Sequence, residues 1–426
     1  MRIFGSRRLL GSILSFFFFA LVLPGISHAA TLIVPTNFPT IQLALDAAGS
    51  GDVIQVKEGE YSEDIDVKTG LLTLLSVDGP GKAKSIGSAL GKAVTIRSGL
   101  GVTIDGFSIE SKGGTAILHE GGGPTDPVVI INNTLQDGVY GFFAHWLGTM
   151  KGTDFTFTGN TVSDCGTGLV AEGFDGCTIR ICDNTFTDCM GYGIQVGKLD
   201  GGMGTDAVIS GNHVTLSGPF VGVCGIHVIH AEDTTLVTEN KVDGPYDYGI
   251  HFEQVGAFGK DPAILEVEKN VVLGSVLSGM HFGTLAFSTR ADVSVLHNTV
   301  ENCGSGFHVI LFNNVSGSSA VFNENNITGN SFGFANDSLE LIDARNNWWG
   351  HASGPDDDRL VPVTPPYNNP SGLGDRVTAF VDYKPWLSEP WVEPVPPSGG
   401  GCSAPAFFPS LVVLLAPLAI LVSTRR

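Results

Sequence analysis

Four histidines occupy the same place in four successive repeats of this chain. His227, His251, His281 and His308 each stand two residues after a glycine, and Gln195 holds that place one repeat earlier. Apolar residues flank all five, so strand alternation would bury the neighbours and turn the polar side chains to the other face. Stacked repeats would place these side chains about 4.8 Å apart. The column could contact a glycan, perform catalysis, or share a divalent metal among His227, His251 and His281.

Two glutamates fall on the same predicted face. Glu253 follows His251 by two residues, and Glu172 holds the equivalent place three repeats earlier. Carboxylates beside His227 and His251 could do acid–base work on a sugar chain. The alternative is an ordinary solvated sheet face on which the imidazoles merely stack. Cationic imidazoles would repel one another, so any function favours neutral rings near pH 7.

Long connections follow the glycine-led strands. The extra residues lie at 144–154, 197–206, 253–262 and 283–292. Long loops on one side of a rigid repeat often build a binding cleft. His145 and Trp146 lie in the first loop, and we expect them to contact substrate together with His281, His308 and Gln195. The alternative is that these loops pack on the body of the domain.

A column of asparagines defines the repeat. Asn recurs in steps of 21 to 30 residues, each time opening a phrase that ends in a glycine-led apolar strand. The positions are Asn133, Asn160, Asn184, Asn212, Asn240, Asn270, Asn298, Asn326 and Asn347. Short strands repeating at this period, without a helical pattern, predict an all-β, single-stranded parallel β-helix of about 10–12 coils. The amides should form an internal ladder, and the glycine should form a corner with positive φ.

One domain, residues 31–387, accounts for these repeats. Thr40 to Ala48 reads as a short amphipathic helix, with Thr40 as its N-cap, that covers the first coil before a strand from Asp52. Aromatic residues at 346–350 and 380–386 should cover the last coil. Residues 388–401 form a Pro/Gly linker.

Both ends of the chain read as targeting segments. Residues 1–30 carry arginines, an apolar run and a small-residue site, which indicate a secretory signal peptide cut after Ala29 or Ala30. Residues 402–426 carry an apolar stretch and two closing arginines, which fit a simple membrane anchor. The Gly-Gly-Cys run, apolar stretch and basic end together resemble the GlyGly-CTERM and Synerg-CTERM sorting tags. That resemblance implies cleavage and display at the cell surface or outer membrane of a bacterium.

Charge limits the partners. The formal net charge is −20, which repels nucleic acid and anionic polymers at long range and is compatible with neutral glycans or cations. The lysines and arginines of the repeats are scattered, without the basic cluster that a uronate lyase needs. Cys165 and Cys189 fall on adjacent coils, where either a disulfide or a pair of buried thiols is compatible with the spacing.

Several phrases resemble the right-handed parallel β-helix superfamily, which is pectate-lyase-like in fold. They are Pro39–Ala48, Gly51–Val56, Gly59–Tyr61, the Asn-x-apolar repeats and Asn347–Gly350 through Gly354-Pro355. The Asn-x-apolar repeats and the segment from Asn347 to Pro355 are similar to the carbohydrate-binding and sugar-hydrolase branch, which includes the NosD-type repeats. The resemblance implies a right-handed solenoid, but this fold hosts many functions. The Asn-Thr-Asp, Asp-Asp, Gly-His-Gly and Arg-Ile-Lys motifs of polygalacturonase-like members are absent from the repeats.

These observations predict a secreted, surface-displayed protein that contacts a polysaccharide or cell-surface glycan without a recognisable catalytic motif. One alternative is a polysaccharide lyase or glycoside hydrolase that works in the histidine-lined groove. Another is a NosD-like periplasmic protein that handles metal. No cofactor is firmly implied, and no nucleic-acid partner is expected.

Overall fold

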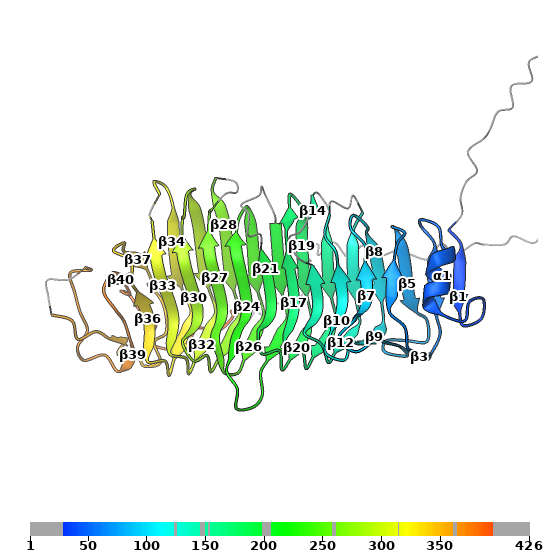
Figure 1. Ribbon diagram of the computed structural model, residues 1–426. Helices are drawn as coiled ribbons and strands as arrows, with labels where there is room; N and C mark the ends of the chain where they lie inside the picture. Colours follow the sequence, from blue (N-terminus) through cyan, green and yellow to red (C-terminus); the bar gives the residue numbers. More distant parts are fainter. Residues whose placement is uncertain are drawn as a thin grey trace, which may run out of the picture. The chain divides into compact units, whose positions relative to one another are not determined.

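The computed structural model describes residues 29–122, 126–144, 150–151, 154–197, 206–257, 261–313, 315–360 and 364–394. One compact unit ends at Trp391 and contains every element described below. Its chain winds as a parallel β-helix, and strands of successive coils lie side by side in sequence order (Figure 1). The predicted solenoid architecture is therefore confirmed.

Within the described residues, to which the strand counts below refer, three long parallel sheets run along the solenoid. Sheet A has 14 strands: β1 (Thr31–Val34), β2 (Val53–Val56), β5 (Leu72–Ser76), β8 (Val102–Asp105), β11 (Val128–Ile131), β15 (Phe155–Thr158), β19 (Thr178–Cys182), β22 (Asp206–Ser210), β25 (Thr234–Thr238), β28 (Ala263–Glu268), β31 (Ala291–Leu296), β34 (Ser319–Asn323), β37 (Ile342–Asp343) and β40 (Val381–Asp382). Sheet B has 11: β3 (Gly59–Tyr61), β6 (Ala83–Ile86), β9 (Phe107–Glu110), β12 (Thr134–Gln136), β16 (Thr161–Ser163), β20 (Thr185–Thr187), β23 (His213–Thr215), β26 (Lys241–Asp243), β29 (Val271–Leu273), β32 (Thr299–Glu301) and β35 (Asn326–Thr328). Sheet C also has 11: β4 (Ile65–Val67), β7 (Lys92–Ile96), β10 (Thr115–His119), β13 (Tyr140–Ala144), β17 (Thr167–Glu172), β21 (Tyr192–Gly197), β24 (Gly222–Ala231), β27 (Tyr246–Val255), β30 (Ser278–Leu285), β33 (Ser305–Phe312) and β36 (Phe332–Asn336).

The core fills the inside of the coils. Strand alternation puts Ala263, Leu265 and Val267 of β28 inside while Ile264 and Glu266 face out. Phenylalanines from neighbouring coils stack within this interior, as the 5.1 Å between the rings of Phe252 and Phe282 shows. Fully burying each such side chain contributes about 1.5–3 kcal/mol.

A ladder of buried asparagines runs along the turn between sheets A and B. From Asn160 onward, the asparagine Oδ1 accepts hydrogen bonds from the backbone N–H and the Nδ2 of the ladder asparagine one coil earlier. Each Nδ2 also donates to a sheet A carbonyl, for example Asn240 to Ile209 at 2.8 Å. The ladder contains Asn133, Asn160, Asn184, Asn212, Asn240, Asn270, Asn298, Asn325 and Asn347, all at most 1% exposed.

One ladder position was predicted wrongly. Asn325, not Asn326, bonds to Asn298 and Asn347, while the Asn326 side chain bonds to the backbone of Trp391. The backbone explains the difference, because the described ladder turns place a left-handed residue just before the asparagine. Glu324, with φ of 57°, holds that place here, as His297 does with φ of 59°. Residue type alone does not show which of two adjacent asparagines occupies the ladder position.

The repeat glycine works by packing rather than by positive φ, which corrects the prediction. Gly168, Gly193, Gly249 and Gly306 lie within sheet C strands and are absent from the left-handed positions. A Cβ on Gly249 would lie 2.3 Å from Val272 Cγ1 and 2.6 Å from the carbonyl oxygen of Gly279. The residue must therefore be glycine because sheet B side chains and the next coil both approach its Cα.

Caps close both ends of the solenoid unit. At the first coil, α1 (Ile41–Ala47) is capped by Thr40 and buries Ile41, Ala44 and Leu45. The strand β1 precedes this helix, so the sheet begins before the predicted start at Asp52. At the last coil, Trp349 and Tyr383 are fully buried beside the short pair β38 (Pro355–Asp356) and β39 (Gly374–Arg376). The Tyr383 hydroxyl donates to the buried Asp357 carboxylate at 2.8 Å.

The predicted targeting segments lie outside the described residues, apart from Ala29 and Ala30. Of the linker, residues 388–394 are described. Within the described ranges α1 is the single helix, and no helix there has the length and apolar character to cross a membrane.

We expect Gly249→Ala to destabilise the fold by about 1–3 kcal/mol, because the added methyl overpacks against Val272 and the Gly279 backbone. Gly49→Ala is the matched control, since its Cβ would meet nothing closer than 3.7 Å. Thermal unfolding of both variants measures the difference. Equal melting temperatures for the two variants would contradict the packing account.

Candidate functional site

The histidine column exists in sheet C and is continuous. Direct register pairs join Gln195 to His227, His227 to His251, His251 to His281 and His281 to His308. Consecutive imidazole centroids lie 4.8, 4.7 and 5.0 Å apart. The polar run is bounded by Val170 before Gln195 and by Ala335 after His308. The spacing follows from parallel pairing, since each coil adds one strand to the sheet.

Two tyrosines extend the column sideways into a wider ring surface. Tyr192 stacks on His227 at 5.3 Å, and Tyr248 lies 5.0 Å from His251 and 4.6 Å from His281. Both tyrosines occupy one row at the start of the sheet C strands, on either side of Cys224. Sequence reasoning missed them, although each stands three residues before a column member. We call the surface formed by these rings the aromatic face; it consists of Tyr192, His227, Tyr248, His251, His281 and His308.

Several nitrogens of the aromatic face are buried without partners. His227 and His281 are 7% and 8% exposed, and the Nδ1 atom of each has no hydrogen-bond partner among the described residues. Nε2 of His227 lies 3.4 Å from Glu253 Oε2, a close contact that lacks hydrogen-bond geometry. By contrast, His308 Nε2 is within 2.9 Å of the exposed Asp337 carboxylate. A buried polar atom left unpaired costs about 1–3 kcal/mol.

The central imidazoles are neutral at physiological pH. Burial, together with the neighbouring His227 and His281, lowers the pKa of His251 to about 3. Burial and the nearby His308 lower the pKa of His281 to about 4. The contact with His227 lowers the pKa of Glu253, so this carboxylate stays ionised. The face therefore combines two uncharged central rings, His251 and His281, with an ionised carboxylate beside them.

The predicted carboxylates are too far apart to act as an acid–base pair. The register places Glu172, Glu253 and Asp337 on one row, each three coils from the next. Three coils correspond to roughly 14 Å at about 4.8 Å per strand. Two-carboxylate hydrolysis needs about 5–9.5 Å. Glu172 is moreover 3% exposed and accepts a hydrogen bond from Gln195.

Metal binding by His227, His251 and His281 finds no support in the geometry. No group of three or more His, Cys, Asp or Glu side chains in the described ranges is arranged to hold a metal ion. The rings of His227 and His251 are nearly parallel, at 16°. These two stacked rings present their faces to each other, whereas a shared metal requires lone pairs in the ring planes to converge. The His281 ring is not part of this stack, since it meets His251 edge to face at 76°.

The predicted long loops lie at the corner between sheets C and A, and only some of their residues are described. His145 and Trp146 lie outside the described residues. The described portion shows β14 (Met150–Lys151) pairing with β18 (Phe174–Asp175), a small extra sheet at this corner. Strand pairing with the next coil thus supports the loop at 144–154.

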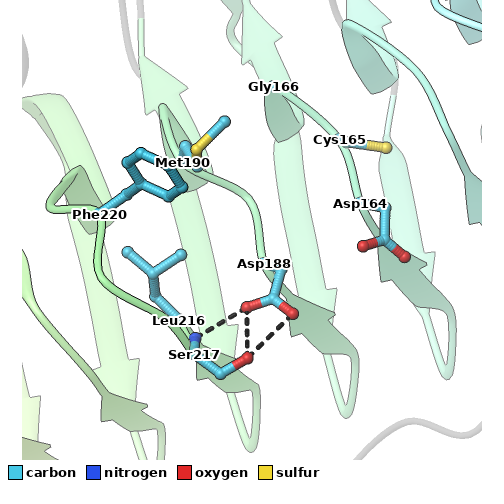
Figure 2. A pocket seen from close by; sticks show the side chains of 8 residues that line it. All are labelled: Asp164, Cys165, Gly166, Asp188, Met190, Leu216, Ser217 and Phe220. Carbon is cyan, nitrogen blue, oxygen red and sulfur yellow. Dashed lines mark hydrogen bonds between the residues drawn. The ribbon is translucent and has the colours of Figure 1, made fainter.

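A separate hollow of about 400 Å³ lies at the corner between sheets B and C. Figure 2 shows Met190 and Phe220 on one side of it and the carboxylates of Asp164 and Asp188 on the other. Asp188 is already engaged, because it accepts from the Ser217 backbone N–H at 2.7 Å and from its hydroxyl. Phe220 is 66% exposed. The hollow is open and mixed in character, and it lies apart from the histidine column.

Cys165 and Cys189 remain thiols. Both are buried in adjacent B–C turns, two residues past the paired Ser163 and Thr187, and neither forms a disulfide. Burial raises the pKa of Cys165 to about 11, so its thiol stays protonated. These thiols pack as apolar groups in the turn.

The comparison with family models agrees with the fold. Residues 92–259 match the family model described as the right handed beta helix region, which covers β7 to β27 and includes His227 and His251. A solved chain titled ORF18 of Geobacillus virus E2 is similar, with 13% identity and a TM-score of 0.32, over 70% of this chain and 57% of that one. A comparison with curated proteins gives no match. Residues 92–259 therefore match a right-handed β-helix family, and the described unit has the parallel β-helix fold that the sequence predicts.

We expect the stability of the fold to fall as pH drops from about 6.5 toward 4. The folded-state pKa values of His251 and His281 lie below the ordinary value of 6.5. As pH falls, these histidines therefore become protonated in the unfolded chain at a higher pH than in the folded chain. The stabilisation is complete above pH 6.5 and is lost as pH falls through the folded pKa values. The double variant His251→Gln, His281→Gln should flatten the melting-temperature profile across this range.

His213→Gln is the control for that profile, because His213 is exposed on sheet B. The carboxylates nearest to these rings, Glu253 and Asp337, remain in every variant. The same slope in the double variant and the parent chain would contradict the neutral-imidazole account.

Proposed function

We propose that this protein binds a linear polysaccharide along the aromatic face. The observation that carries the proposal is the unbroken register of four imidazoles flanked by two tyrosines, with ring centroids 4.6 to 5.3 Å apart. Flat rings with polar edges suit sugars, since one side of a sugar is apolar and its rim carries hydroxyls. A rigid row of such rings matches a polymer that repeats along its own axis.

The same face argues for binding rather than cleavage. Its carboxylates are three coils apart, which is too wide for the acid and base of a hydrolase. A uronate lyase would need a cation to neutralise the substrate carboxylate, and strands β21, β24, β27, β30 and β33 contain neither Lys nor Arg. Binding without turnover is the function that these residues support best.

We also propose export and display at the bacterial surface. The support is in the sequence, where residues 1–30 have the charge and apolar pattern of a signal peptide and residues 402–426 that of a sorting tag or membrane anchor. A secreted location would place the aromatic face in contact with extracellular or cell-surface glycans.

The test is affinity electrophoresis of the purified full chain through gels that contain different soluble polysaccharides. We expect at least one polysaccharide to retard the parent chain. Aromatic pairs contribute about 0.5–1.5 kcal/mol each, so Tyr248→Ala with His251→Ala should weaken that binding about tenfold. His213→Ala, on exposed sheet B, is the control.

Sugar release is measured in the same samples. If reducing ends or unsaturated uronate appear with time, the protein cleaves the polysaccharide, and the proposal of binding without turnover is wrong. Failure of every polysaccharide in a broad panel to retard the chain would contradict the proposed function.

A further inference from the structure

We propose that the ligand of the aromatic face is an uncharged, hydroxyl-rich glycan, and that its hydroxyls pair with the ring nitrogens of His227 and His281. This inference rests on the proposed function and specifies its ligand class. It follows from three features of the described residues: unpaired buried nitrogens, the absence of cations on the five strands, and a negative edge.

The unpaired nitrogens select for hydroxyl groups. Nδ1 of His227 and Nδ1 of His281 are buried without a hydrogen-bond partner, although both rings face the outer side of sheet C. A neutral imidazole offers one donor and one acceptor. A sugar hydroxyl can both donate and accept, so it can satisfy either nitrogen in either tautomer. An ionised carboxylate only accepts, so it can serve Nδ1 only in the tautomer that carries the proton there, and an ammonium only donates, so it can serve only the other tautomer.

The charges around the face disfavour acidic sugars. Glu253 and Asp337 lie on the row beside the histidines, with half or more of each side chain exposed. Arg290, on the corner after β30, is already held by Asp261 at 2.8 Å. A uronate lying on the face would meet carboxylates without a free cation on the strands beneath it. Like charges in proximity repel, and salt screens that repulsion.

The direction of the ligand follows from the register. The rings repeat across the strands, along the solenoid axis, in steps of 4.7 to 5.0 Å. A glycan chain that contacts all four imidazoles must therefore run along this axis. Affinity should rise with oligosaccharide length until the chain spans the column from His227 to His308, and then level off.

The first experiment compares two forms of one polymer on the full chain by calorimetry at pH 7. The probes are the neutral polysaccharide that binds best and the same preparation oxidised at C6 to its uronic form. We expect the oxidised form to bind at least about tenfold more weakly, with part of the loss recovered at high salt.

The outcomes separate the two proposals. Equal or tighter binding of the oxidised polymer overturns the neutral-ligand inference while leaving glycan binding intact. Failure of both polymers to bind overturns the proposed function and this inference with it.

The second experiment isolates the ring nitrogens. His227→Phe keeps a ring that can stack on Tyr192 but removes both nitrogens, and it relieves the unpaired Nδ1. We expect an unchanged or higher melting temperature together with roughly tenfold weaker binding of the neutral polymer. His213→Phe, on sheet B, is the control. Parent-like binding by His227→Phe would show that stacking alone accounts for recognition and would overturn the hydroxyl-pairing inference.

Discussion

The buried asparagine ladder is the constraint on which the rest of the structure depends. Each ladder amide between the two ends bonds to the asparagines before and after it and to a sheet A carbonyl, as Asn240 does with Asn212, Asn270 and Ile209. These groups are shielded from solvent, so a shift of one residue would leave several polar atoms unpaired at about 1–3 kcal/mol each. The ladder therefore fixes the register of the coils from Asn133 to Asn347 relative to their neighbours.

Register is what turns a sequence repeat into a surface. One strand per coil places like residues above like, so His227, His251, His281 and His308 become adjacent although 24 to 30 residues separate them in the chain. Burial and mutual repulsion then keep the central rings neutral. A ring-lined strip with two uncharged rings at its centre, beside ionised Glu253, results from the fold rather than from any single residue.

Much of this was predictable from sequence, because a solenoid makes contacts between equivalent positions. The parallel architecture, the caps at Thr40 and Trp349, and the histidine column all follow from period and alternation. The errors concern packing: Asn325 instead of Asn326, and a Gly249 required by its close approach to Val272 rather than by backbone conformation. The contribution of Tyr248 was missed because its contacts cross coils diagonally, toward both His251 and His281. Such neighbours depend on side-chain direction, which a repeat pattern alone does not specify.

The most direct test of the ladder is thermal unfolding of Asn240→Ala beside Asn313→Ala. Asn240 is 1% exposed and anchors bonds to two coils, whereas Asn313 makes one exposed hydrogen bond, to Phe287. The account predicts a loss of about 3 kcal/mol or more for Asn240→Ala and little change for Asn313→Ala. Equal stability of the two variants would mean that apolar packing alone sets the register, and the ladder would lose its central place.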